Sequence, residues 1–307
     1  MKIKPLLAAL MICILLLAGC ASASPDTTTI VTSFYPMYVF AQNIAKDISG
    51  VEVRNMADQS VGCLHDYQLQ TRDMVTLEGA DVLVINGGGM EQFMDKIASM
   101  YSDLTVVEAS AGIEMMCSVA ENHDHAGEAH HHENENVVYN AHVWLNPELA
   151  VQQIRAIAQG LSAADEANAQ AYQANAEAYI ARITSMKDEI AVQLAPYAQE
   201  KMIIFHEAFA YYAEAFGLEV AGVIAHEAGE EPGTREIAKT CDLVKELGVK
   251  ALFVEPQYPT KTADTIARET GASMYSLDPV VSGDGSMESY ETIMRMNANV
   301  LSEAFSK

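Results

Sequence analysis

The chain has 307 residues, half of them hydrophobic, with 18 basic and 42 acidic side chains and a formal net charge of −24. That length and apolar content are enough for one large or two medium domains with substantial cores. So acidic a chain argues against nucleic acid as a partner, and its surface favours cations as ligands.

The first twenty residues have the pattern of a secretory signal. Two lysines precede an apolar run over residues 6–17, and Leu-Ala-Gly then leads to Cys20. The run is too short to cross a membrane comfortably. A cysteine after Leu-Ala-Gly resembles the lipobox of bacterial lipoproteins, although a plain secretory signal with an incidental cysteine is the alternative. We expect residues 1–19 to be removed, Cys20 to be lipidated, and residues 20–27 to tether the protein outside the cytoplasmic membrane.

From residue 28 onward, short apolar runs alternate with amphipathic stretches. This alternation is typical of strands that alternate with helices in a parallel sheet. In the first half we expect strands at 29–33, 51–56, 81–86 and 104–108, and helices at 36–47, 71–79 and 91–100.

Residues 114–136 interrupt the alternation. The stretch has no apolar periodicity and carries histidines among Glu, Asp, Asn and Gly, namely His123, His125, His130, His131 and His132. Such a composition is typical of a loop rather than a packed element. Neutral imidazole suits zinc, copper and nickel, so we expect this loop to capture metal loosely, as an auxiliary site. The alternative is a solvated tract without function.

The second half begins with a helix over residues 147–160, for which Asn146 is a suitable N-cap and Pro147 a suitable first residue. A second helical run over 165–195 is long enough to traverse the molecule. Strands then alternate with helices again: strands at 201–205, 218–224, 251–255 and 273–277, helices at 207–216, 234–247, 261–270 and 288–305. The sequence therefore predicts an α/β fold with two parallel-sheet lobes, residues 28–163 and 197–307, joined by a helix within residues 164–196.

Four residues outside the histidine-rich loop lie where parallel sheets bind ligands. His206 and Asp278 directly follow expected strands, His65 lies beyond the second strand, and His142 precedes a helix. Because ligands bind at the carboxyl ends of parallel strands, we expect all four in the cleft between the lobes. Taken alone, His142 is better explained as a hydrogen-bonded structural residue. Together, three imidazoles and a carboxylate suit tetrahedral Zn²⁺, whereas Mn²⁺ prefers more oxygen ligands.

Signals for a zinc hydrolase are weak. His206 and His226 are each followed by Glu, but Ala210 and Glu230 stand where the second histidine of an HExxH motif would be. A secreted metallohydrolase would also need an activated water and a general base, for which Glu207 is the one weak candidate.

The mature chain would keep three cysteines, Cys63, Cys117 and Cys241. In an oxidising compartment an odd set of three suggests at most one disulfide. We expect a Cys63–Cys117 pair, because both residues lie in the first half near the proposed site.

Five stretches carry a resemblance to the zinc-binding lipoproteins of ABC transporters, the cluster A-I solute-binding proteins. They are GCLHDYQLQTRD, NAHVWLNP, IIFHEAFAYYAEAFGL, EPGTREIAKT and YSLDP, with the acidic histidine-rich loop before the second. The likeness extends from about Thr28 to the end of the chain. It implies that His65, His142, His206 and Asp278 are the metal ligands and that the connecting helix is rigid.

The resemblance also implies a function: an extracytoplasmic monomer, not an enzyme, that captures Zn²⁺ and delivers it to an ABC permease with its cytoplasmic ATPase. Manganese members of the family have Glu at the third ligand position, so His206 favours zinc; a manganese or iron carrier and a surface adhesin on the same scaffold are the alternatives. The sequence departs from the family at Leu64 (usually Pro), Gln68 (usually Glu) and Asn146 (usually Asp). These changes affect the expected loop shape and the hydrogen bonds around the ligands more than the ligands themselves.

Overall fold

The computed structural model describes residues 27–58, 64, 67–118, 138–224 and 232–307. The predicted ligand His65, the histidines of the loop at 123–132, His226, Cys20 and Cys63 lie outside these residues.

The first half forms a parallel four-stranded sheet in the order β2-β1-β3-β4. Ile30 of the central strand pairs with Val53 on one side and Val82 on the other. The two central strands are almost entirely buried because helices cover the sheet, and β3 is apolar throughout, as expected for a parallel sheet. The strands are β1 (Thr28–Thr32), β2 (Val51–Asn55), β3 (Val82–Ile85) and β4 (Thr105–Glu108), and the helices are α2 (Tyr35–Ile44), α3 (Thr71–Leu77) and α4 (Met94–Met100).

The second half repeats this arrangement, with strand order β6-β5-β7-β8 and all pairs parallel. In the first sheet the strand order reverses direction between β1 and β3, and in the second sheet it reverses between β5 and β7. Ligands of α/β sheets bind at such a point. The strands are β5 (Lys201–Ile204), β6 (Glu219–Val223), β7 (Ala251–Val254) and β8 (Ser273–Ser276), and the helices are α7 (Ala210–Ala215), α8 (Thr234–Leu247) and α9 (Lys261–Thr270).

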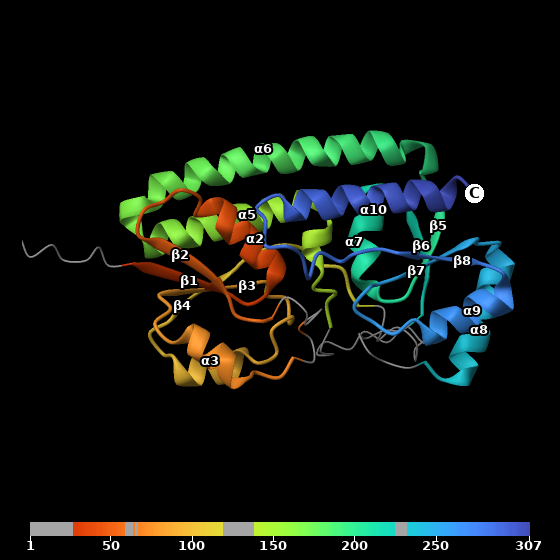
Figure 1. Ribbon diagram of the computed structural model, residues 1–307, viewed down its shortest axis with the longest axis horizontal. Helices are drawn as coiled ribbons and strands as arrows, with labels where there is room; N and C mark the ends of the chain where they lie inside the picture. The colour runs from red at the N-terminus through yellow and green to blue at the C-terminus, as the bar shows by residue number, and fades with distance from the viewer. Residues whose placement is uncertain (1–26, 59–63, 65–66, 119–137, 225–231) are drawn as a thin grey trace, which may run out of the picture.

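Three longer helices connect and cover the two sheets: α5 (Pro147–Ala164), α6 (Ala169–Leu194) and α10 (Ser289–Phe305). Figure 1 shows α6 running along the long axis of the molecule above both sheets, with α10 beside it. Among the residues described, none of the helices is both long enough and apolar enough to cross a membrane.

The long helix starts later than the expected residue 165. A short 3-10 turn over Glu166–Asn168 separates it from α5. The Asp165 carboxylate stabilises this turn, because its Oδ2 accepts hydrogen bonds from Asn168 at 2.8 Å and from the Tyr172 hydroxyl at 2.9 Å. Partial burial by itself would raise the pKa of Asp165, but the hydrogen bonds to its charged form together outweigh burial and lower the pKa.

Two other expected helices also begin late. The helix expected from residue 91 begins at Met94, because the Glu91 carboxylate instead accepts hydrogen bonds from the backbone of Asn86 and Gly87. The helix expected from residue 207 begins as a 3-10 turn, Glu207–Phe209, before α7.

One continuous apolar core joins the halves. It contains Ile30 and Val84 of the first sheet and Ile204 and Phe253 of the second, with the fully buried Trp144 among them. Because the contacts between the halves belong to this core, the two sheets are packed as parts of one body.

Candidate metal site

The structure brings together two of the predicted ligands, one from each half. The rings of His142 and His206 meet edge to face with centroids 4.7 Å apart. His142 has no solvent-exposed surface and His206 is 2% exposed. His142 precedes a 3-10 turn (Val143–Leu145) that leads into α5, and His206 lies two residues beyond β5.

The start of α5 holds the His142 segment in place. Asn146 is the N-cap, since its side chain accepts a hydrogen bond from the Glu148 amide at 2.9 Å, and Pro147 occupies the first turn, as predicted. The Trp144 ring lies 5.2 Å from the His142 ring, and its Nε1–H donates to the carbonyl of Pro279 at 2.8 Å. The sole tryptophan therefore ties the His142 segment to the loop that carries Asp278.

Asn140 contacts both the His142 segment and the second half of the chain. Its Oδ1 lies 3.0 Å from the backbone nitrogen and 2.8 Å from the ring Nδ1 of His142. Its Nδ2 donates to the carbonyl of Glu207, the residue after His206, at 3.0 Å. The Tyr211 hydroxyl donates to the Asn140 carbonyl at 2.9 Å. Asn140 is buried, and no pattern in the sequence marked it as a site residue.

His206 has a buried carboxylate beside it. Its Nδ1 lies 3.3 Å from Oε1 of Glu255, which directly follows β7, the strand next to β5. Glu255 is 2% exposed, and among the described residues its Oε2 has no hydrogen-bond partner. A buried carboxylate oxygen of this kind fits a site for a cation. The Tyr258 ring also lies near His206, with the two ring centroids 6.1 Å apart.

Asp278 lies in a tightly held loop after β8. Its Oδ1 accepts a hydrogen bond from the Val280 amide at 2.8 Å, and its own amide donates to Asn297 at 2.9 Å. Val280 has φ +63°, a strained value for a β-branched residue. Burial raises the pKa of Asp278, the Val280 amide opposes that rise, and the charge of Glu255 adds to it.

The predicted set of four ligands stays a prediction. Among the residues that the structure describes, no three His, Cys, Asp or Glu side chains lie close enough to hold one ion. The rings of His142 and His206 are in contact, and the charge of Glu255 acts on Asp278. His65 lies outside the described residues.

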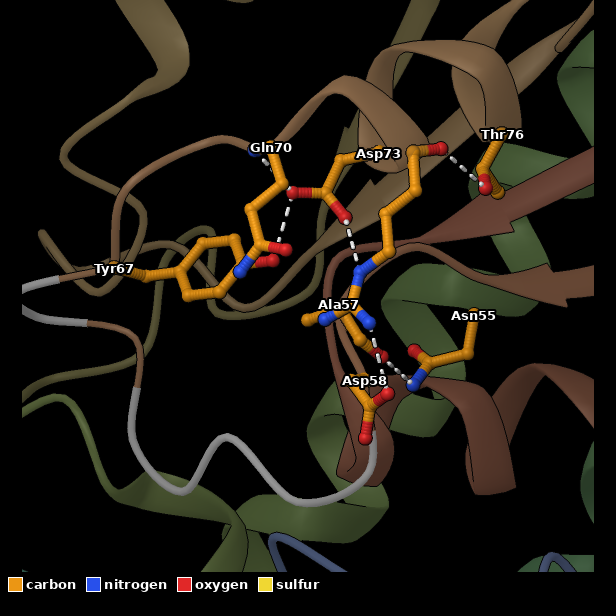
Figure 2. Close-up of polar contacts among 8 residues, drawn as sticks. Asn55, Ala57, Asp58, Tyr67, Gln70, Asp73 and Thr76 are labelled. Carbon is orange, nitrogen blue, oxygen red and sulfur yellow. Dashed lines mark hydrogen bonds and ion pairs between the residues drawn. The ribbon is translucent and has the colours of Figure 1, made fainter.

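Asp58 and Tyr67, described residues on either side of His65, contact side chains at the start of α3 (Figure 2). The buried carboxylate of Asp73 accepts hydrogen bonds from the Tyr67 hydroxyl and the Gln70 amide, both at 2.7 Å. Arg72 pairs with Asp58 at 3.0 Å, so Asp58 and Tyr67 are both held against one helical turn. Burial, and then the bond to Asp73, raises the pKa of Tyr67 to about 12, so its hydroxyl keeps its proton at neutral pH.

The two cysteines that the structure describes are free thiols, Cys117 exposed and Cys241 buried. Cys117 forms an isolated antiparallel bridge with Tyr139 at the base of the histidine-rich stretch. Its expected partner Cys63 lies outside the described residues, so the Cys63–Cys117 disulfide stays a prediction.

The model of a known family, the periplasmic component A of zinc-uptake complexes, matches residues 30–304. This chain belongs to that family. The family predicted from the five sequence stretches is therefore confirmed, and so is the fold of two parallel-sheet α/β lobes.

Similar proteins support the same assignment. The high-affinity zinc uptake system protein ZnuA of Bacillus subtilis is 30% identical over 95% of this chain and 94% of its own length. The zinc-binding lipoprotein AdcA of Streptococcus pneumoniae is 28% identical over 98% of this chain, which spans only 60% of that relative. Among solved structures, the SBP FpvC of Pseudomonas aeruginosa, in complex with Ni²⁺, has a TM-score of 0.77 and 30% identity over 91% of this chain and 97% of its own.

Proposed function

We propose that this member of the zinc-uptake family captures Zn²⁺ outside the cytoplasmic membrane and delivers it to an ABC permease driven by a cytoplasmic ATPase. The observation that carries the proposal is the buried pair of His142 and His206, which come from different halves of the chain with rings 4.7 Å apart. His65 and Asp278 complete the proposed ligand set.

The chemistry of the proposed set favours zinc. Three imidazole nitrogens and one carboxylate are ligands typical of tetrahedral Zn²⁺, whereas Mn²⁺ prefers a site richer in oxygen. The resemblance adds to this, because manganese members of the family have Glu at the third ligand position, where this chain has His206. A manganese carrier is the alternative, and the competition experiment below separates the two.

We propose no chemical reaction for the site. Four protein ligands fill a tetrahedral shell and leave no position for the water that a catalytic zinc activates. Glu207, the one candidate general base, accepts a hydrogen bond from the Ser118 hydroxyl at 2.9 Å and is buried. That contact supports a structural role for Glu207. A surface adhesin on this scaffold remains the other functional class, and it would not require a tight zinc site.

The remaining parts of the proposal come from the sequence. Residues 1–19 would be a cleaved signal, Cys20 a lipid-bearing N-terminus and residues 20–27 a tether to the outer face of the membrane. Residues 28–163 and 197–307 would be the two lobes of a monomer, with residues 164–196 between them, and the histidine-rich loop would collect metal near the main site.

The deciding experiment is a metal analysis and a competitive zinc titration of the protein that begins at residue 20. We expect one tightly bound Zn²⁺ that displaces Mn²⁺. In His206→Ala the affinity should fall at least 100-fold, because one of four ligands is lost and its neighbour Glu255 is left without a partner. His226→Ala removes a histidine outside the proposed set and is the matched control. Tight zinc binding that survives His206→Ala would place the main site elsewhere and contradict the proposal.

A further inference from the structure

The orientation of the Asn140 amide follows from two partners whose roles cannot change. The backbone nitrogen of His142 can only donate, so the atom 3.0 Å from it is the amide oxygen. The carbonyl of Glu207 can only accept, so the atom 3.0 Å from it is the amide nitrogen. The side chain of Asn140 thus has a single orientation that satisfies both contacts.

That orientation fixes the proton on His142. The same Oδ1 that faces the backbone also lies 2.8 Å from the ring Nδ1, and an oxygen acceptor there requires a proton on Nδ1. The neutral ring then carries its lone pair on Nε2. Glu255 has the equivalent effect on His206, since its carboxylate oxygen lies 3.3 Å from Nδ1 of that ring.

Asn140 also fixes the spacing of the two rings. Its Nδ2 binds the carbonyl of Glu207, which is covalently next to His206, and its own carbonyl accepts from the Tyr211 hydroxyl at 2.9 Å. One residue therefore links the His142 backbone and ring to the backbone that carries His206. All of these contacts are buried, where an unmade hydrogen bond costs most.

We propose that Asn140 is a positioning residue for the cargo ion: it holds His142 in the Nδ1-protonated form, leaves Nε2 for the metal, and sets the His142–His206 pair before metal arrives. The inference rests on the proposed function for the identity of the cargo. Its structural part concerns the metal-free protein and can be tested there.

The first test measures the His142 tautomer in the metal-free wild type by nitrogen-15 NMR at a pH where the ring is neutral, with the signal assigned by its loss in His142→Gln. We expect Nδ1 to be protonated and Nε2 unprotonated. A ring protonated mainly on Nε2 would overturn the proposal whatever the protein binds.

The second test compares zinc affinity in two variants of Asn140. Asn140→Ala removes every side-chain contact and should weaken zinc binding about 10- to 100-fold, the usual effect of losing a residue that orients a ligand. Asn140→Asp keeps an acceptor for His142 but faces the Glu207 carbonyl with an oxygen. It should keep the Nδ1-protonated tautomer and lose less affinity than Asn140→Ala.

Asn175→Ala is the matched control, because the Asn175 amide donates to the carbonyls of Ile44 and Lys46, which belong to α2 and the turn after it. It should leave both zinc affinity and the tautomer unchanged. Zinc binding of Asn140→Ala within about twofold of wild type would contradict the proposal. If Asn140→Ala does not fold, the zinc affinity of Asn140→Asp and the His142 tautomer of the wild type still test the proposal. A wild type without tight zinc would instead refute the proposed function, and the tautomer measurement would still test Asn140.

Discussion

The Asp73 carboxylate is fully buried and accepts hydrogen bonds from the Tyr67 hydroxyl and the Gln70 amide. It also lies 3.7 Å from the Arg72 guanidinium. We expect Asp73→Ala to lower the free energy of unfolding by about 1–3 kcal/mol, because buried donors lose their acceptor. Zinc affinity should fall as well, since Tyr67 is two residues from the proposed ligand His65. Urea unfolding and zinc competition measure the two effects.

Asp73→Asn is the control for this prediction. Its amide oxygen can still accept from both Tyr67 and Gln70, so most of the stability and affinity should return. Zinc affinity equal to that of the wild type in Asp73→Ala would show that the contacts in Figure 2 have no influence on the metal site.

At the scale of single residues, the sequence was informative where a functional side chain directly follows an apolar strand. That rule led to the predictions for His206 and Asp278, and it applies equally to Glu255, which directly follows the same kind of strand but lies in a Glu-Pro sequence typical of an ordinary turn. Asn140 could not be found this way, because its role depends on Glu207, a residue 67 positions away. Contacts of that range are created by the packing of the two halves, and no local pattern encodes them.

The packing of α5 against β4 depends on Gly160. A Cβ at this position would lie 2.5 Å from Cγ2 of Val107. Gly160→Ala gains about 1 kcal/mol of helix propensity, but forcing an extra carbon into a packed contact costs about 1–3 kcal/mol. We expect a net loss of stability in urea unfolding.

The double variant tests that explanation. Val107→Ala removes the methyl groups that the new Cβ would meet, so Gly160→Ala should be less harmful in that background than in the wild type. Equal effects in the two backgrounds would attribute the loss to something other than this contact.

At the scale of elements, the eight strands within the described residues were predicted to within two residues, because short apolar runs between turn signals are distinctive. α8 and α9 were predicted at their exact bounds, since each ends at a glycine in the left-handed conformation, Gly248 and Gly271. The errors concern helices: α2 ends three residues early, at Ile44, α5 continues to Ala164, four residues beyond its expected end, and three helices begin late. At a late start, a side chain such as Asp165 or Glu91 binds nearby backbone or side-chain groups and delays the helix, which hydrophobic periodicity does not reveal.

The shared core sets the behaviour of the whole molecule. Ile30 and Phe253 belong to different sheets but to one cluster of buried side chains, and α6 packs along both halves (Figure 1). We therefore expect the metal-free protein to unfold in a single transition, with equal calorimetric and van't Hoff enthalpies. Scanning calorimetry measures both. Two separated transitions would show that the halves are independent folding units.

The identical strand order of the two sheets suggests a division of labour within a repeated architecture. Two residues beyond the first central strand, one half places Phe34, whose ring packs on Trp144, and the other half places His206. One residue beyond the other central strand, the first half places Asn86, which binds the carbonyl of Ala141, and the second places Glu255. Equivalent positions thus hold scaffold residues in the first half and, in the second, a proposed ligand and the carboxylate beside it. Substitution of Phe34 or Asn86 can therefore shift the geometry of the site without removing any of its proposed donor atoms.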